Sequence, residues 1–171
     1  MNGRRDWSRR SLWLILALIG VALPAAAQAP AACPWINLAT ASGVLDGEAS
    51  LSLINQSPTN TTCTFEYKSG DEIRTLSVQV IRMVDPGKEY APYKAQCDRD
   101  ATPMRAIGNE ALLCPASGLA NAHGLRVVGR VRTNAFILTL STTAKSSSVM
   151  TQQAMEGKIG FVAELVSGNL F

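Results

Sequence analysis

One stretch, Leu125 to Leu140, constrains the fold of this chain more than any other. It reads LRVVGRVRTNAFILTL, and apolar and polar side chains largely alternate on both sides of its centre. Such alternation predicts strands, because successive side chains of a strand point to opposite faces. Thr133-Asn134 is the only turn-like pair in the stretch, and Asn tolerates the left-handed conformation that tight turns need. The sequence therefore predicts a β-hairpin with Arg132 opposite Ala135.

The predicted hairpin has an apolar face and a basic face. The apolar face carries Leu125, Val127, Gly129, Val131, Phe136, Leu138 and Leu140. The basic face carries Arg126, Arg130 and Arg132 among Val128, Ala135, Ile137, Thr139 and Ser141. We expect the apolar face to belong to the core. Gly129, predicted opposite Leu138, would let another element pack closely.

Residues 1–27 have the three parts of a secretory signal peptide. Four arginines precede the apolar run Leu12–Ala22, and small residues up to Ala27 follow it. The run is shorter than the roughly 20 residues that a membrane-spanning helix needs. We expect cleavage after Ala27, although a site two residues later fits the same pattern. The expected product is an exported, periplasmic or secreted domain over residues 28–171, with no stable membrane span. An uncleaved anchor and a lipoprotein modified at Cys33 are the alternatives.

Removing the predicted signal peptide changes the charge of the chain. The whole chain has 16 Lys+Arg and 13 Asp+Glu, a net charge of +3. Because residues 1–27 hold four arginines and one aspartate, the remaining 144 residues hold 12 positive and 12 negative side chains. A neutral domain gives no support for nucleic-acid or membrane binding through bulk charge. Its length suits a single domain with a proper core.

All four cysteines, Cys33, Cys63, Cys97 and Cys114, lie in the part of the chain that we expect to be exported. An even number of cysteines in such a chain predicts two disulfides. Three pairings are possible. We favour Cys33–Cys63 and Cys97–Cys114, because each would tie a helix-associated segment to a nearby strand. A zinc site made by all four is the alternative, but the sequence has no C-x-x-C pair, so we expect no metal and no cofactor.

Apolar periodicity divides the domain into two rounds of elements. Helical spacing predicts a helix after Asn37, a short helix near residues 91–96 and a closing helix over about residues 149–166. Alternating segments predict three strands in each interval between these helices. Short turns join most of these strands, so the sheet should be antiparallel. The expected fold is α+β, an antiparallel sheet of about six strands with three helices packed on it and two disulfides.

Four short motifs are spread over this domain. They are Cys33-Pro34-Trp35, Cys63-Thr64-Phe65, Ile107-Gly108-Asn109-Glu110-Ala111, and Val128-Gly129-Arg130-Val131-Arg132 followed by Ala135-Phe136. Together these motifs resemble a group of small bacterial secreted proteins and lipoproteins of uncharacterised function, although the group has glycine where this chain has Ala106. Such proteins are similar in element order to the PsbP-like α/β/α fold. The resemblance implies a fold and supplies no catalytic residue.

Candidate catalytic residues are few. His123 is the only histidine, and its sequence context predicts a solvated turn; any Ser or Cys nucleophile would need it as the base. The sequence contains no G-x-S-x-G, S-x-x-K or H-E-x-x-H motif. Asp98 and Asp100 could share a cation, but they fit a solvated loop better. Gly108-Asn109-Glu110 predicts a turn whose side chains hydrogen-bond to backbone amides, with a ligand role for Glu110 as the alternative.

Arg126, Arg130 and Arg132 form the only basic cluster predicted in an otherwise neutral domain. Guanidinium groups suit carboxylates and phosphates, so these arginines predict an anion-binding patch. A solvated outer face of the sheet is the alternative. The sequence favours a non-catalytic extracytoplasmic binding or sensing module for an unknown small molecule or envelope partner. The other hypotheses are a structural or partner-binding envelope protein, including an inhibitor-like role, and, third, a hydrolase using His123 or a carboxylate pair in a cleft.

Overall fold

The computed structural model of the chain describes residues 32–97 and 100–171. The predicted signal peptide, residues 1–27, lies outside these ranges. Asp98 also lies outside them, so the predicted pairing of Asp98 with Asp100 is not described. No helix within the described ranges is long and apolar enough to cross a membrane.

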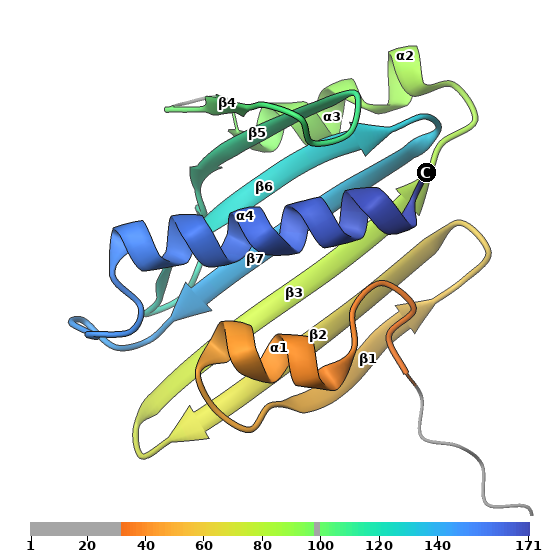
Figure 1. Cartoon of the computed structure of the whole chain (residues 1–171). Helices are drawn as coiled ribbons and strands as arrows, with labels where there is room; N and C mark the ends of the chain where they lie inside the picture. Colours follow the sequence, from red (N-terminus) through yellow and green to blue (C-terminus); the bar gives the residue numbers. More distant parts are fainter. Residues whose placement is uncertain (1–31, 98–99) are drawn as a thin grey trace, which may run out of the picture. The chain divides into compact units, whose positions relative to one another are not determined.

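The described part of the chain forms a seven-stranded antiparallel sheet with the order β1-β2-β3-β7-β6-β5-β4 (Figure 1). The strands are β1 (Ser50–Gln56), β2 (Asn60–Ser69), β3 (Glu72–Arg82), β4 (Thr102–Met104), β5 (Glu110–Pro115), β6 (His123–Val131) and β7 (Asn134–Thr142). The first three strands form one meander and the last four form another. The two meanders join where β3 pairs with β7, and we call this pairing the seam.

Helices cover both faces of the sheet. Helices α1 (Leu38–Leu45) and α4 (Gln152–Asn169) pack on one face, called here the front face. Two short helices and a 3-10 turn cover part of the rear face: α2 (Pro86–Glu89), α3 (Ala91–Lys94) and η1 (Ala95–Cys97). The α+β class, the large antiparallel sheet and three helical regions agree with the sequence prediction.

Side-chain caps fix where the two longer helices begin. Asn37 Oδ1 accepts a hydrogen bond from the Thr40 amide at 2.7 Å, and Thr151 Oγ1 accepts one from the Ala154 amide at 3.2 Å. Each bond satisfies one of the amides that the first turn of a helix leaves without a backbone partner. The closing helix therefore begins and ends three residues later than the predicted residues 149–166.

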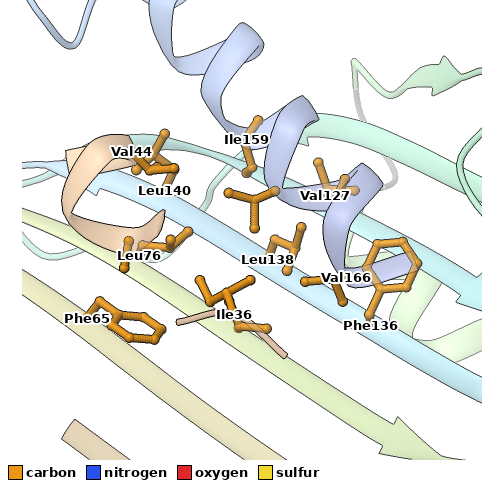
Figure 2. Close-up of a cluster of buried hydrophobic side chains, with 14 of the residues drawn as sticks. Ile36, Val44, Phe65, Leu76, Val127, Phe136, Leu138, Leu140, Ile159 and Val166 are labelled. Carbon is orange, nitrogen blue, oxygen red and sulfur yellow. The ribbon is translucent and has the colours of Figure 1, made fainter. Parts of the chain in front are cut away.

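The main core lies between the front face of the sheet and helices α1 and α4 (Figure 2). Its largest fully buried side chains include Phe65 on β2, Leu76 on β3 and Leu138 on β7, while α4 contributes Ile159 and Val166. A smaller core on the rear face gathers around Tyr90, Val128 and Ile137 beneath the short helices. Because both faces of the central strands are buried, β6 and β7 have apolar side chains on each side.

The β6–β7 hairpin keeps its predicted faces but not its predicted turn. Val131 pairs with Asn134, so the loop is Arg132-Thr133 and not Thr133-Asn134. The register moves by two residues, which leaves every strand side chain on its predicted face. Arg132 adopts the left-handed conformation, with φ of 52°, and its amide donates a hydrogen bond of 2.6 Å to Asn109 Oδ1. This contact from another segment fixes the turn one residue earlier than the local sequence suggests.

Gly129 is the close-packing position of this hairpin. It lies opposite Phe136, and not opposite Leu138 as predicted. A Cβ atom at Gly129 would overlap the ring of Phe136. The glycine therefore leaves room for an aromatic ring from the neighbouring strand, and not for a separate element.

The sheet has one strand more than predicted, because β4 lies within the segment that we expected to be a loop. Its three residues pair with β5 at the edge of the sheet. Three residues are too few to show alternation in the sequence. Pro103, at the centre of β4, also argues against a strand, although an edge strand can accept a proline because one side of it needs no donor.

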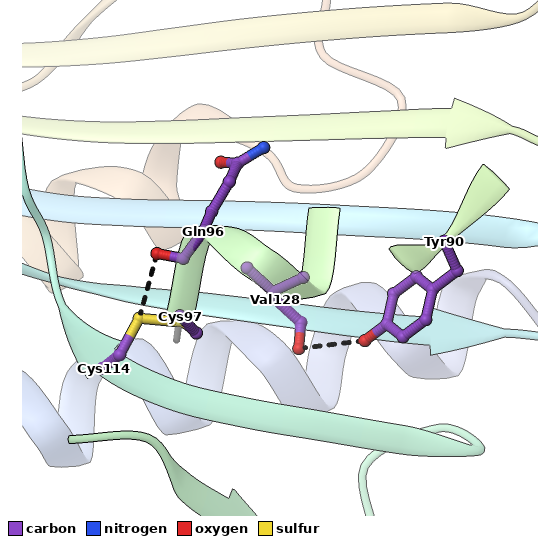
Figure 3. The surroundings of a disulfide bond; sticks show 5 residues. All are labelled: Tyr90, Gln96, Cys97, Cys114 and Val128. Carbon is purple, nitrogen blue, oxygen red and sulfur yellow. Dashed lines mark hydrogen bonds between the residues drawn. A yellow bond between two sulfur atoms is a disulfide. The ribbon is translucent and has the colours of Figure 1, made fainter. Parts of the chain in front are cut away.

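The two disulfides have the favoured pairing. Cys33 is joined to Cys63 with a Cα–Cα distance of 5.8 Å, and Cys97 is joined to Cys114 with a distance of 5.5 Å. Figure 3 shows the second disulfide, which ties η1 to β5 on the rear face. The Gln96 carbonyl oxygen lies 3.9 Å from the Cys114 sulfur, a contact only, since a disulfide sulfur has no proton to donate. Each disulfide links two segments on the same side of the seam.

Two cations bind the C-terminal end of α1. Arg74, only 8% exposed, donates from Nη1 to the Leu45 carbonyl at 2.9 Å and from Nε and Nη2 to the two carboxylate oxygens of Glu72 at 2.8 and 2.9 Å. Lys158 of α4 donates to the Val44 carbonyl at 2.9 Å and also pairs with Asp46. These contacts satisfy carbonyls that have no partner within the helix and complement the negative end of its dipole.

Candidate anion-binding pocket

The structure does not bring the three predicted anion-binding arginines together. Arg126 and Arg130 lie four residues apart on the rear face of β6, which is about 13 Å along a strand. Arg132 lies in the turn beyond the end of β6 and lines a different surface. The predicted continuous basic face therefore separates into three environments.

Arg130 already has an anionic partner within the protein. Its Nε lies 3.5 Å from Glu110 Oε1, and Lys94 Nζ lies 3.1 Å from Glu110 Oε2. The guanidinium also lies over the Tyr90 ring, 5.8 Å from its centroid. Burial raises the pKa of Tyr90 to about 12, an increase to which the Glu110 carboxylate adds and which Arg130 opposes. Glu110 thus offsets one of the two positive charges of Lys94 and Arg130, and its two ion pairs give the cluster the form of a structural network.

Arg126 lies deeper in the rear face. It pairs in register with Cys114 on one side and Thr139 on the other. Its Nε atom is buried and, within the described part of the chain, has no hydrogen-bond partner. Arg126 lines neither the pocket at Arg132 nor the hollow at His123, so by itself it does not define a site.

The predicted turn at Gly108-Asn109-Glu110 holds the tip of the β6–β7 hairpin. Gly108 has φ of 61°, and the Asn109 amide donates to the Arg130 carbonyl at 2.7 Å. The side chain that bonds to a backbone amide is that of Asn109, which accepts from Arg132, whereas Glu110 begins β5 and forms ion pairs. This turn therefore fixes the backbone of Arg132.

Arg132 lines a pocket of about 380 Å³ at the end of the sheet, called here the tip pocket. The pocket lies where the 57–61 turn, the last residue of β3 and the β6–β7 turn meet Trp35 and Leu170. Two backbone hydrogen bonds hold these turns against β3, from the Arg82 amide to Thr59 O at 2.8 Å and from the Met83 amide to Thr133 O at 2.7 Å. The pocket is thus built on fixed backbone.

Two arginines make the tip pocket positive. Arg82, which lies opposite Asn134 across the seam, and Arg132 are both exposed, and neither forms an ion pair with any described residue. The Arg132 guanidinium lies over the Phe171 ring at 5.6 Å. The C-terminal end of α4 is close by and carries about half a negative charge. Two full positive charges exceed this half charge, so the residues that line the pocket carry a net positive charge.

Trp35 is another residue that lines the tip pocket. Its side chain is half-buried and packs against the main core, and the indole Nε1 atom is buried without a hydrogen-bond partner among the described residues. Sequence reasoning identified neither Trp35 nor Arg82 as a site residue, because their proximity depends on the pairing of β3 with β7.

His123 is the first residue of β6 and not part of a turn as predicted. It lines a second, open hollow of about 530 Å³ together with Ser146, Ser147 and Ser148. Among the described residues, no hydrogen bond joins His123 to a serine or to a carboxylate. Ser147 Oγ accepts instead from the Met150 amide at 3.3 Å. The hollow therefore holds the residue types of a hydrolase without the hydrogen-bonded pair that activates a nucleophile.

No group of three His, Cys, Asp or Glu side chains within residues 32–97 and 100–171 is placed to hold a metal ion. Comparisons of the chain with protein-family models, with curated proteins and with solved structures gave no match. The resemblance to secreted proteins with a PsbP-like element order stays a prediction. Inference about function therefore rests on the geometry of the site.

Proposed function

We propose that this chain is an exported, non-catalytic binding module that takes a small anionic ligand in the tip pocket. The observation that carries the proposal is the presence of two arginines, Arg82 and Arg132, that line one pocket and have no carboxylate partner in the described structure. Guanidinium groups bind carboxylates and phosphates with paired hydrogen bonds.

Two further features support the proposal. Residues 1–27 have the pattern of a signal peptide, and the two disulfides are typical of proteins outside the reducing cytosol. The pocket also lies on backbone that hydrogen bonds fix, so little conformational entropy is lost when a ligand binds. The proposed location is the periplasm or the outside of the cell.

The other hypotheses have less support. A partner-binding envelope protein would present a continuous exposed apolar patch. Among the side chains that the structure describes, the large exposed apolar ones are Leu38 in α1, Val84 after β3, Phe161 in α4 and Phe171 after α4. A hydrolase would use the hollow at His123, where the hydrogen-bonded pair is missing. We therefore place the anion-binding role first and keep these two as alternatives.

Binding of inorganic phosphate and of succinate at low ionic strength tests the proposal. Trp35 is the only tryptophan outside residues 1–27, so its fluorescence in the exported protein reports directly on the pocket. Arg82→Gln/Arg132→Gln should weaken binding about tenfold or more, because a hydrogen bond to a charged group contributes roughly 1.5–3 kcal/mol. The matched control is Arg105→Gln, which removes an exposed arginine outside the pocket. Equal weakening by both variants, or no binding by the wild type, would refute the proposal.

A further inference from the structure

The wall of the tip pocket is rich in uncharged polar side chains, which distinguish one anion from another. Besides the two arginines, six serine, threonine and asparagine residues line the pocket, against four apolar residues. The six are Ser57, Thr59, Asn60, Thr61, Thr133 and Asn134. Hydroxyls and amides both donate and accept, whereas an ionised carboxylate only accepts. A ligand that carries hydroxyl groups beside its negative charge would therefore use this wall more fully than a simple anion.

Hydrogen bonds within the protein already use two of the six side chains. Ser57 Oγ accepts from the Asn60 amide at 2.9 Å and donates to the Asn60 carbonyl at 3.1 Å. Asn60 Oδ1 accepts from Gln79 Nε2 at 3.4 Å. The side chains of the other four form no hydrogen bond with a described residue, so they are available to a ligand; they are Thr59, Thr61, Thr133 and Asn134.

Two of the available side chains lie beside Arg82 on three adjacent strands. Arg82 pairs with Asn134 across the seam, and Val80, two residues before Arg82, pairs with Thr61 on β2. Val80 belongs to the main core, so all three polar side chains lie on the front face of the sheet. Thr61 is only 8% exposed, but its hydroxyl oxygen is not one of the buried polar atoms that have no partner. The small exposed part of Thr61 therefore includes this oxygen.

The tip pocket is also larger than a simple anion needs. One water molecule occupies about 30 Å³ in the liquid, so a pocket of about 380 Å³ holds the equivalent of about 12 water molecules. Phosphate would fill less than half of this space, whereas a sugar ring that carries an acid group would fill most of it. A sugar ring also offers both kinds of surface that the wall presents, hydroxyls at its edge and C–H groups on its faces.

We propose that the ligand of the tip pocket is an acidic sugar, a single pyranose ring that carries a carboxylate or a phosphate. The acid group binds the two arginines, and ring hydroxyls form hydrogen bonds with Thr61 and Asn134. This inference rests on the proposed function, because the acid group occupies the anion site. One hydrogen bond between uncharged groups strengthens binding roughly fivefold, so two of them should raise the affinity at least about tenfold.

The test uses ligands that separate charge from hydroxyl groups. Glucuronate, galacturonate and glucose 6-phosphate carry both, cyclohexanecarboxylate and inorganic phosphate carry the charge without ring hydroxyls, and methyl glucoside carries the hydroxyls without charge. Affinities for the exported protein are measured at low ionic strength by calorimetry and by Trp35 fluorescence. Glucuronate should bind at least about tenfold more tightly than cyclohexanecarboxylate, or glucose 6-phosphate than inorganic phosphate, and methyl glucoside should bind more weakly than either sugar acid.

A pair of variants locates the groups that recognise the hydroxyls. Thr61→Val/Asn134→Ala removes two uncharged polar groups and keeps both arginines, so the ratio of the affinities for glucuronate and cyclohexanecarboxylate should fall to near one. The matched control is Thr62→Val/Thr139→Ala, which changes residues of the same two strands that do not line the pocket. The control should keep the wild-type ratio.

The outcomes separate this inference from the proposed function. If the simple anions bind but neither acidic sugar binds more tightly than its hydroxyl-free counterpart, the acidic sugar is wrong and the anion site stands. If methyl glucoside binds as tightly as glucuronate, or if no anion binds, both proposals fail. Binding of trigalacturonate without binding of galacturonate would overturn the recognition of a single ring and leave the anion site in place.

Discussion

Replacing Arg74 with methionine tests how far a buried cation stabilises this fold. Arg74 joins the β2–β3 hairpin to the end of α1 through a hydrogen bond to the Leu45 carbonyl, and it donates two more to Glu72 on its own strand. Its guanidinium also lies over the Tyr67 ring at 5.1 Å. Methionine keeps most of the apolar volume of the side chain, so the change in stability measures mainly the loss of charge and donors.

The expected loss is about 3 kcal/mol. Removing one partner of a buried ion pair costs roughly 3–5 kcal/mol, because the other charge stays buried without compensation. The Glu72 side chain is 20% exposed and keeps a hydrogen bond of 3.1 Å from Thr142, which places the loss at the lower end of that range. For a domain of this size we expect the melting temperature to fall by roughly 10 °C.

The same hairpin provides a matched control. Glu66 and Lys68 form an ion pair with the same spacing along a strand, at 2.6 Å, but their side chains are 36% and 65% exposed. Lys68→Met should therefore cost less than about 1 kcal/mol. The two pairs share residue spacing and strand geometry, so the comparison sets a buried arginine that also bonds to the Leu45 carbonyl against an exposed lysine.

Urea unfolding followed by circular dichroism, with the disulfides intact, measures both variants. The double variant Glu72→Gln/Arg74→Met should recover part of the loss, since it leaves no unpaired carboxylate. A loss for Arg74→Met no larger than that for Lys68→Met would refute the reasoning that burial makes this pair costly to break.

Four other predictions test separate features. The pKa of Glu72 is lowered, chiefly by the hydrogen bond from Arg74. The ionised Glu72 therefore stabilises the folded state fully above the pKa of an unfolded glutamate, about 4.3. This stabilisation is lost as the pH falls through the lower pKa of the folded state. Glu72→Gln should flatten the acid side of a plot of unfolding free energy against pH, and an unchanged slope would contradict this account. Gly129→Ala puts a Cβ into the aromatic ring opposite and should lower the melting temperature by several degrees; an unchanged value would contradict that packing. Cys97→Ala/Cys114→Ala removes a disulfide between residues 17 apart and should lower the free energy of unfolding in urea by about 3 kcal/mol. A loss below about 1 kcal/mol would be inconsistent with this disulfide. Asn109→Ala releases the amide at the hairpin tip and should weaken phosphate binding in the tip pocket several-fold, whereas equal affinity would show that the turn does not position the site.

Local sequence patterns correctly predicted the parts of the fold that depend on residues close together in the chain. Alternation placed the side chains of β6 and β7 on the correct faces, because successive side chains of a strand point to opposite faces. The disulfide pairing followed from the proximity of each cysteine pair in the order of elements. The turn was wrong because Asn109, which is 23 residues away from Arg132, supplies the hydrogen bond that decides it.

The candidate site was less predictable than the fold. Arg132 was identified as an anion-binding residue, but its partner Arg82 lies in a different hairpin. Nothing in the sequence shows that β3 and β7 are neighbours, because the strand order results from packing between two meanders. Arg126 and Arg130 are separated from Arg132 by even numbers of residues, so the sequence predicts all three on one face of the hairpin. In the structure Arg132 lies in the turn and not on that face.

The seam between β3 and β7 also has a consequence for the order of folding events. Residues that pair across it, such as Val78 and Leu138, are about 60 residues apart in the chain, whereas the hairpins close over a few residues. Loop closure over that length is entropically costly and slows folding. The Cys97–Cys114 bond shortens the chain that connects β3 to β7. It lowers the entropic cost of closing this loop by only roughly 0.3 kcal/mol, which changes the folding rate by less than a factor of two. Each meander can therefore oxidise before the two halves meet, and their non-covalent docking sets the folding rate in either redox state.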